Sequence, residues 1–456
     1  MRIIVAGAGK LGYSIAQLLA EKQYDVVVVE PDQQRVEHVQ NSLDVLALEG
    51  NACDPAMYNN LDLQDADMLI ACTDSDEANM VTCILAKKYG IKNTVGRIRN
   101  VEYATNAKEM LHTDMKLDMI LNPERLTAKD IFNRLATSGI KNFVHFANGK
   151  VRIFENKLGE DSPYIKKPLK ELNLPQDILV AMVFRNHQMI IPRGNDVLQP
   201  GDNVYFVGKQ EAIKAFEKKF VKSNTKVQKI VLIGAGRCGR ILAPMLEEKG
   251  FDLKVIERNK ERCALLAGKL EKSTSKILCN DATEIDFLLS EGVDQADVVV
   301  CLTEDDKLNL MLAQLVKHLG DKDTKKKVKT IVRVARNEYV DLMEKVGVDI
   351  VVSSRFLSCN EVYRFVRRGG ILSTALLEDG QAEALEIMVG KNSQVEGKAL
   401  RDLALPHNCL LCSIVRQGEA YVPNGNTVLQ VGDRVVLFIA SDVLDKIVPM
   451  FKGRSG

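Results

Sequence analysis

The chain has 456 residues, and its 62 Lys and Arg residues stand against 61 Asp and Glu residues, so the formal net charge is +1. Hydrophobic residues make up 46% and charged residues 27%, which is typical of a globular protein and excludes a disordered chain. The charge balance excludes a strongly basic nucleic-acid binder by composition, so no nucleic-acid partner is expected, and the length predicts about three domains, or four if some are small.

The apolar runs of the sequence are short. None approaches the roughly 18 residues that cross a bilayer, and the segment after Arg2 is too short and too rich in glycine for a signal peptide. We therefore expect a cytoplasmic protein whose ten cysteines are thiols rather than disulfides. Cys72, Cys83, Cys279 and Cys301 lie in apolar segments, which favours small, buried hydrophobic side chains.

The first part of the chain alternates strand-like and helix-like patterns. Runs rich in Val and Ile predict strands at residues 2–6, 25–29, 44–48, 68–72 and 93–98. These runs lack in-out alternation, which is typical of strands buried on both faces. Between the first two, Leu11, Ile15, Leu18 and Leu19 fall on one helix face. Strands and helices in alternation predict βαβ units and a parallel sheet.

The pattern changes after a further predicted helix from Pro123 to about Ala136. Two strand-like runs flank Asn148-Gly149, which predicts a hairpin with a type I′ turn. The following segment is rich in strands and carries turn signals such as Pro200-Gly-Asp. We interpret it as a small, β-rich α+β domain.

The same order of features recurs about 230 residues further on, which indicates a duplication. Residues 230–239 repeat the pattern of residues 3–12, and a second helix is predicted from Arg355 to about Arg368. The predicted fold is α/β: a tandem duplication of a Rossmann-like, doubly wound parallel sheet, with a small β-rich α+β domain after each sheet. The predicted domains are residues 1–138, 139–225, 226–369 and 370–456.

The first strand and the first helix are joined by the turn Gly7-x-Gly9-x-x-Gly12. The first glycine permits the tight turn, the second lets the backbone approach a pyrophosphate, and the third lets helix and strand pack closely. The helix N-terminus offers unpaired N–H groups to phosphates. Glu30 ends the next strand about 20 residues on, where an acid accepts the ribose hydroxyls of an adenosine. The alternative is that the glycines serve packing alone.

The second copy repeats the turn at residues 234–239 and the acid at Glu257. The two copies are not identical, however. Pro244 lies inside the following helix, where it removes one hydrogen bond and favours a kink. Arg258 follows Glu257, whereas Pro31 follows the first acid, and the guanidinium is expected to tolerate a phosphate near the ribose better.

Other polar residues follow the fourth strand and end the fifth strand of each copy. They are Thr73, Asp74 and Arg97 in the first copy, and Thr303, Glu304 and Arg333 in the second. Ligands of open α/β sheets lie beyond the carboxyl ends of the strands, so we expect these residues to line the pockets. The arginines are placed to reach phosphates, and a surface salt bridge is the alternative for each.

These motifs carry a resemblance to a known family. The Gly-Ala-Gly turns with their acids, the stretch at residues 65–80 and the Arg97-Ile-Arg-Asn-x-Glu-Tyr stretch resemble RCK (regulator of potassium conductance) domains. The strand-rich parts resemble the small domain that follows an RCK domain. Two such pairs in one chain resemble the TrkA family of regulatory subunits of Trk potassium uptake systems.

The resemblance implies a regulator rather than an enzyme, and no metal site. It implies binding of NAD, NADH, ATP or ADP, assembly into a homo-oligomer that is a tetramer in similar proteins, and a TrkH-type integral-membrane partner. The chain would lie on the inner face of the plasma membrane through that partner and gate potassium entry. The residues that match the nucleotide-binding motifs are Gly7, Ala8, Gly9, Lys10, Leu11, Gly12, Glu30, Thr73, Asp74, Arg97, Gly234, Ala235, Gly236, Arg237, Cys238, Gly239, Glu257, Thr303, Glu304 and Arg333.

Two other functions remain open from the sequence. An NAD-dependent dehydrogenase would need a catalytic acid or base, but the six histidines do not fall at duplicated positions. A regulator of another cation transporter, such as a cation/proton antiporter, would use the same domains. The Cys409-x-x-Cys412 pair lies in a strand-like run, where a spacing of three predicts opposite faces and core packing rather than a metal or redox site. Glu304 in place of Asp74 and Ala335 in place of Arg99 put an equal ligand preference of the two sites in doubt.

Overall fold

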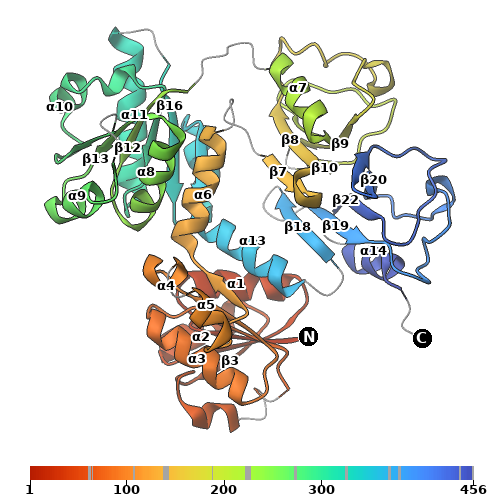
Figure 1. The fold of residues 1–456 in the computed structure, drawn as a ribbon, viewed down its shortest axis with the longest axis horizontal. Coiled ribbons are helices and arrows are strands. Elements are labelled where there is room, and N and C mark those ends of the chain that lie inside the picture. Colours follow the sequence, from red (N-terminus) through yellow and green to blue (C-terminus); the bar gives the residue numbers. More distant parts are fainter. Residues whose placement is uncertain are drawn as a thin grey trace. The chain divides into compact units, whose positions relative to one another are not determined.

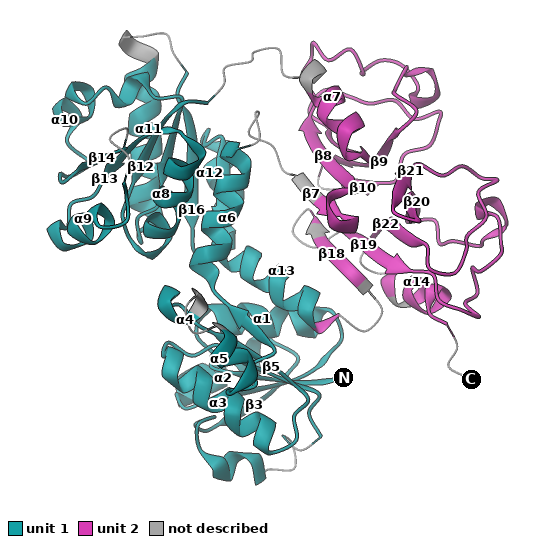
Figure 2. Cartoon of the chain, viewed as in Figure 1, with its two compact units in different colours: residues 1–138, 226–365 teal, residues 139–225, 366–456 magenta. Residues whose placement is uncertain are grey.

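The computed structural model describes the chain except residues 60–62, 64, 106–107, 137–142, 187, 221–226, 272–274, 324–326, 368–370, 378–381, 441–442 and 454–456. The chain forms two compact units, each of which combines segments from both copies (Figure 2). Unit 1 contains residues 1–138 and 226–365, and unit 2 contains residues 139–225 and 366–456. The predicted domain boundaries after residues 138, 225 and 369 lie outside the described residues.

Unit 1 holds two parallel sheets. The first has the strand order β3-β2-β1-β4-β5-β6. Its strands are β1 (Arg2–Ala6), β2 (Asp25–Glu30), β3 (Leu46–Glu49), β4 (Met68–Ala71), β5 (Asn93–Arg97) and β6 (Met119–Leu121). Its helices are α1 (Lys10–Glu21), α2 (Gln33–Ser42), α3 (Asp76–Lys88), α4 (Val101–Thr105) and α5 (Lys108–Thr113). The five predicted strands are present, whereas β6 was not predicted because three residues are too few to show a period.

The second sheet repeats the first with the order β14-β13-β12-β15-β16-β17. Its strands are β12 (Lys229–Ile233), β13 (Asp252–Ile256), β14 (Ser275–Leu278), β15 (Val298–Cys301), β16 (Lys329–Val334) and β17 (Ile350–Ser353). Its helices are α8 (Arg237–Lys249), α9 (Lys260–Ala267), α10 (Ile285–Ser290), α11 (Asp306–Asp323) and α12 (Val340–Lys345). Pro244 lies within α8, which continues past it for more than a turn.

Two further helices connect the copies within unit 1. Helix α6 (Pro123–Ala136) follows the first sheet, but it packs against α8 of the second (Figure 1). It also contacts β17 of that sheet. Helix α13 (Ser354–Val366) follows the second sheet, and its Tyr363 ring lies under Nζ of Lys22, which caps α1 of the first. Each predicted helix is present, and each contacts the other copy. This exchange joins the two sheets into one unit.

Unit 2 holds two antiparallel sheets with equivalent strand orders, β10-β9-β11-β8-β7 and β18-β19-β22-β20-β21. The first consists of β7 (Phe143–Phe146), β8 (Val151–Lys157), β9 (Ile178–Arg185), β10 (Gln188–Ile190) and β11 (Asn203–Lys209), followed by α7 (Gln210–Phe220). The second consists of β18 (Ile371–Leu377), β19 (Ala382–Met388), β20 (Cys409–Arg416), β21 (Glu419–Tyr421) and β22 (Arg434–Ala440), followed by α14 (Leu444–Phe451).

The predicted turn at Asn148-Gly149 is present between β7 and β8. Both residues have positive φ angles, 56° and 88°, and Lys150 N donates to Ala147 O at 3.3 Å. Ala147 itself has a φ of 52°, so the left-handed segment is one residue longer than a two-residue turn requires.

The two sheets of unit 2 share one hydrophobic core. It contains Tyr205 from the first sheet and Phe438 from the second, whose ring centroids lie 6.4 Å apart. Cys412 lies in this shared core, whereas Cys409 lies in the core on the other face of the second sheet. The predicted opposite orientation of the two thiols is therefore confirmed.

The prediction of buried thiols is confirmed at Cys72, Cys83 and Cys301 and wrong at Cys279. Cys279 is exposed because it lies one residue beyond β14, where the chain leaves the sheet. Within the part of the chain that the structure describes, no helix combines the length and the apolar character needed to cross a bilayer.

Candidate functional site

The turn between β1 and α1 is shaped by its glycines. Gly7 has a φ of +99°, in the left-handed region where only glycine fits readily. A Cβ atom on Gly12 would lie 1.9 Å from the carbonyl oxygen of Gly7, so this glycine is required for close packing of helix against turn. A Cβ atom on Gly9 would meet no atom within 4 Å. Packing therefore explains Gly7 and Gly12, but it leaves Gly9 unexplained.

The N-terminus of α1 lacks the side-chain cap that three other helices of unit 1 carry. Side chains of Asp32, Ser75 and Asn259 cap helices α2, α3 and α9 by accepting hydrogen bonds from backbone N–H groups. The N-cap residue of α1 is Gly9, which has no side chain, and the first turn of α1 carries no acid. Helix α8 has the same arrangement, with Gly236 as its N-cap residue. Both starts leave their N–H groups and the positive end of the helix dipole for an anion.

Glu30 lies at the end of β2 and is 4% exposed. Its Oε2 atom accepts a hydrogen bond of 2.5 Å from Ala8 N, in the middle of the glycine turn. Its Oε1 atom accepts one of 3.2 Å from Asp32 N, just before α2. The acid predicted for the ribose thus lies beside the turn predicted for the pyrophosphate, and the two features form one candidate site.

The second copy reproduces this geometry. Gly234 has a φ of +106°, and a Cβ atom on Gly239 would lie 2.1 Å from the oxygen of Gly234. Glu257 is 6% exposed, and it accepts hydrogen bonds of 2.7 Å from Ala235 N and 2.9 Å from Asn259 N. The two copies share these hydrogen bonds as well as the sequence motif, which favours the same function for both turns.

The remaining residues of the predicted turns differ in exposure. Leu11 and Cys238 are buried, and burial raises the pKa of the Cys238 thiol to about 12. Lys10 and Arg237 are exposed at the first position of each helix. The buried pair can offer a ligand backbone N–H groups but not side chains, whereas the exposed pair can add a positive charge.

Asn79, a residue that the sequence analysis missed, links the ends of β4 and β5 at this site. Asn79 is fully buried, and its Oδ1 accepts hydrogen bonds from Thr73 N at 2.9 Å and Thr73 Oγ1 at 2.8 Å. Its Nδ2 donates to Arg97 O at 2.8 Å. Asn309 makes the same contacts with Thr303 and Arg333 in the second copy. The recurrence of Asn at equivalent positions of both copies is the signal that could have identified it.

Three strand-end residues of the first copy are in contact through Arg97. Arg97 Nη1 donates to Thr73 O at 3.1 Å and lies 3.3 Å from Asp74 Oδ1. Asp74 is 86% exposed, so the alternative of a surface salt bridge describes this contact. The pair lies beyond the carboxyl ends of β4 and β5, where a ligand of this sheet would bind.

The charges of the second copy are arranged differently. Arg333 Nη1 donates to Thr303 O at 3.3 Å, but the acid Glu304 lies 3.7 Å from Arg262 of α9 instead. This contact lies near the glycine turn, because a Cβ atom on Gly236 would be 4.0 Å from atoms of both residues. In the first copy the arginine of α2, Arg35, lies near Glu30 and Asp32. The two sites therefore have the same backbone geometry but differ in how the charged side chains around them are paired.

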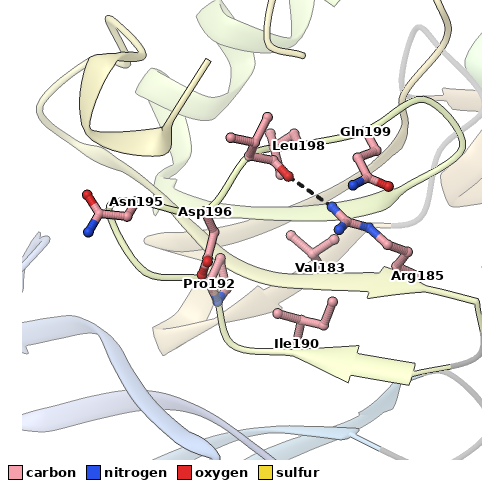
Figure 3. A pocket seen from close by; sticks show the side chains of 9 residues that line it. Val183, Arg185, Ile190, Pro192, Asn195, Asp196, Leu198 and Gln199 are labelled. Carbon is pink, nitrogen blue, oxygen red and sulfur yellow. Dashed lines mark hydrogen bonds between the residues drawn. The ribbon is translucent and has the colours of Figure 1, made fainter. Parts of the chain in front are cut away.

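A separate pocket of about 270 Å³ lies in the first small domain, beside Arg185 (Figure 3). Arg185 donates to both carboxylate oxygens of Asp202 at 2.7 Å and to Val197 O at 3.0 Å. The second small domain repeats these contacts with Arg416 and Asp433. The arginine is neutralised by a buried acid and holds a turn, so this pocket is a weaker candidate for a binding site.

Two domain families match the sequence. The TrkA-N domain matches residues 3–123 and 230–354, and the TrkA-C domain matches residues 153–221 and 384–452. A Trk system potassium uptake protein TrkA homolog of Archaeoglobus fulgidus is 35% identical over 452 residues, which cover 99% of this chain and 100% of the relative. The Trk system potassium uptake protein TrkA of Vibrio alginolyticus is 31% identical over 449 residues, which cover 97% of this chain and 96% of the relative.

Solved structures show the same fold at low sequence identity. The GsuK RCK domain has a TM-score of 0.62 and 18% identity, and the match covers 98% of this chain and 94% of that one. The GsuK channel bound to NAD has a TM-score of 0.62 and 19% identity, with 98% of this chain and 78% of that one covered. The tandem Rossmann-like sheets, each followed by an antiparallel domain, are therefore an RCK-type fold.

Proposed function

The chain belongs to the TrkA family, and on that premise we propose that it is a nucleotide-responsive regulatory subunit that gates potassium uptake. The curated relatives are named for a potassium uptake system and not for an enzymatic reaction, which agrees with the interpretation as a regulator. The ligands we propose are NADH or NAD, with ATP or ADP as further adenosine nucleotides for the same sites.

One observation carries the proposal: in each copy a helix without a side-chain cap begins beside a buried acid. Gly9 and Gly236 are the N-cap residues of these helices, and Glu30 and Glu257 are the acids. A buried carboxylate fixed next to free N–H groups fits a ligand with hydroxyl groups at one end and phosphates in the middle. An adenosine nucleotide has this chemistry, and bound NAD in a channel of the same fold supports the assignment.

Each residue then has a defined role in our proposal. The N–H groups at the start of α1 and α8 bind the phosphates, and Lys10 and Arg237 add positive charge from the solvent side. Glu30 and Glu257 accept the hydroxyls of the ribose. The strand-end residues, among which Arg97 and Arg333 carry charge, line the far side of each pocket. The nucleotide supplies the differential contacts that move the regulator between its states.

We propose a homo-oligomer, a tetramer as in similar proteins, on the cytoplasmic side of a TrkH-type membrane partner. Exposed apolar residues at equivalent positions of the two copies support self-association. Val81 of α3 and Met311 of α11 are 44% and 49% exposed, and Met110 of α5 and Leu342 of α12 are 38% and 52% exposed. We take these recurring exposed side chains as positions at which another protein chain would pack, because such surfaces gather exposed apolar residues.

The proposed switch obeys a simple energetic limit. A nucleotide shifts an equilibrium between two states only by the difference in its affinity for them. Moving a regulator from mostly closed to mostly open takes about 5 kcal/mol. Two sites per chain, multiplied by the chains of an oligomer, reduce the preference that each site must supply to a fraction of that value.

The experiment that tests this function is rubidium or potassium uptake at low external potassium in cells with and without the gene. We expect uptake to fall without the gene and to return with the wild-type chain, but not with a double variant Glu30→Gln and Glu257→Gln that is present at the same level. Full uptake without the gene would reject the proposed role and favour another cation transporter as the partner. Full rescue by the double variant would reject regulation through these sites.

A further inference from the structure

An ion pair lies at Gly236, the N-cap residue of α8. Arg262 Nη2, on α9, is 3.7 Å from Oε1 of Glu304, which follows β15. A Cβ atom on Gly236 would lie 4.0 Å from Arg262 Nη1 and 4.0 Å from Glu304 Oε1. Helix α9 follows β13, and β13 and β15 flank β12 on its two sides. The two side chains therefore approach the turn from either side and meet where we propose that phosphates bind.

The same space is open at the first site. Among the residues that the structure describes, no atom lies within 4 Å of a Cβ atom placed on Gly9. The equivalent acid, Asp74, lies 3.3 Å from Arg97 instead. The equivalent arginine, Arg35, lies 3.7 Å from Asp32. The two sites therefore differ in whether a carboxylate lies at the turn.

Two differences in sequence account for the ion pair of the second copy. The N-cap residue of α2 is Asp32, whereas that of α9 is Asn259, which has no charge to attract the arginine three residues later. Glu304 is one methylene group longer than Asp74, so its carboxylate can extend further toward the glycine. Because both differences act together, the arginine of the second copy pairs across the turn rather than within its own helix.

We propose that Arg262 and Glu304 form a charged latch that selects the ligands of the second site by their phosphates. Glu304 lies where a phosphate would approach, and like charges at short distance repel. An entering phosphate displaces Glu304 and takes its place beside Arg262, whose planar guanidinium binds phosphate oxygens in pairs. The carboxylate thus opposes binding, and the arginine promotes it. The inference rests on the proposed function, because it requires nucleotide phosphates at this turn.

The latch is weak enough for a ligand to open it. The side chains of Arg262 and Glu304 are 43% and 75% exposed. An ion pair at this exposure changes an equilibrium by about fivefold at most. Either side chain can turn into solvent without becoming a buried, unpaired charge. A nucleotide therefore reaches the turn without a rearrangement of the fold.

Two substitutions test the latch because they break the same ion pair. Calorimetry is carried out on the full chain with ATP and, separately, with NADH, in a Glu30→Gln background so that the second site dominates binding. We expect the added substitution Glu304→Gln to strengthen binding about threefold or more, because it removes a negative charge from the turn. The added substitution Arg262→Gln should weaken binding about threefold or more, because the phosphates lose a cation. A purely structural ion pair would move both affinities in the same direction, and that result would overturn the proposal.

The two nucleotides test whether phosphates are the selected group. ATP carries more negative charge than NADH, and the repulsion by a carboxylate grows with the charge of the ligand. The gain in affinity from Glu304→Gln should therefore be larger for ATP than for NADH. An equal or smaller gain for ATP would overturn selection by phosphate charge.

The control uses an ion pair of the same domain that includes no residue of the site. Lys254 Nζ and Glu291 Oε2 lie 3.4 Å apart, and Glu291→Gln makes the same chemical change there. This variant should leave both affinities unchanged. Unchanged affinity in Glu304→Gln and Arg262→Gln would overturn the latch but leave the proposed function intact. If neither nucleotide binds to the Glu30→Gln chain or to its Glu304→Gln derivative, the second nucleotide site is rejected, and the latch with it.

Discussion

Glu30 Oε2 accepts a hydrogen bond of 2.5 Å from the backbone N–H of Ala8. The same carboxylate accepts a bond of 3.2 Å from Asp32 N, and Glu257 makes the equivalent pair of contacts in the second copy. The acid therefore fixes the glycine turn and the start of the following helix before any ligand binds. A ribose would meet a carboxylate that is already oriented, and little ordering remains to oppose binding.

The first prediction concerns this carboxylate. The substitution Glu30→Gln keeps the shape of the side chain but removes the charge, and hydrogen bonds to charged groups contribute about 1.5–3 kcal/mol. We expect NADH affinity at the first site to fall about tenfold or more, with the fold intact by circular dichroism. Calorimetry measures this affinity. The matched control is Glu257→Gln, which should leave NADH affinity at the first site unchanged. Unchanged affinity in Glu30→Gln would rule out the ribose assignment.

The second prediction concerns the choice between NADH and NADPH. A 2′-phosphate would approach the buried carboxylate of Glu30, and like charges at short distance repel. NADPH should therefore bind the first site at least about tenfold more weakly than NADH, a difference of about 1.4 kcal/mol. The difference should be smaller at the second site, where Arg258 follows the acid. Equal affinities of the first site for both cofactors, measured in the Glu257→Gln background, would refute this prediction.

The third prediction separates two glycines of one turn. Gly12→Ala places a Cβ atom 1.9 Å from Gly7 O, so the backbone must move. We expect the free energy of unfolding to fall by about 3 kcal/mol or more, which should appear as faster amide hydrogen exchange in β1 and α1. Gly9→Ala meets nothing within 4 Å and has an ordinary φ of −63°, so the exchange rates should stay unchanged.

Nucleotide binding gives a second test of the Gly9→Ala variant. If the backbone at Gly9 approaches a pyrophosphate, the added methyl group should weaken nucleotide binding by about tenfold without a change in stability. Wild-type affinity in Gly9→Ala would show that phosphates do not approach this residue. Gly236→Ala offers the parallel experiment in the second copy.

The fourth prediction concerns the buried asparagine. Asn79→Ala removes the partners of Thr73 N and Arg97 O at once, whereas Thr73 Oγ1 keeps its contact with Ser75 O. A polar group left without a partner away from water costs about 1–3 kcal/mol. We expect the free energy of local unfolding to fall by about 2–4 kcal/mol, which should appear as faster amide hydrogen exchange in β4 and β5. Asn309→Ala should act likewise on β15 and β16, while the exposed substitution Gln34→Ala should change neither sheet. Unaltered exchange in Asn79→Ala would mean that Asn79 does not hold these strand ends together.

Part of the site was accessible from the sequence because its motif is local. Gly7, Gly12 and Glu30 act through a turn and the next strand, so spacing along the chain predicts their neighbourhood. Asn79 acts across strands, on Arg97 O, and neither periodicity nor a motif identifies the carbonyl it binds. The sequence also did not predict that Asp74 pairs with Arg97 whereas Glu304 pairs with Arg262. A long arginine side chain can reach several acids, and the tertiary structure decides which one it contacts.

The sequence by itself determined the duplication, the alternation of strands and helices, and the two glycine turns with their acids. These features follow from backbone conformation and from burial on one face, which are properties of neighbouring residues. Only the tertiary structure decided that α6 packs against α8 of the other copy and that Tyr205 and Phe438 share a core. Residues in different elements meet through the register of strands and the packing of helices onto them, and the local sequence pattern does not record either.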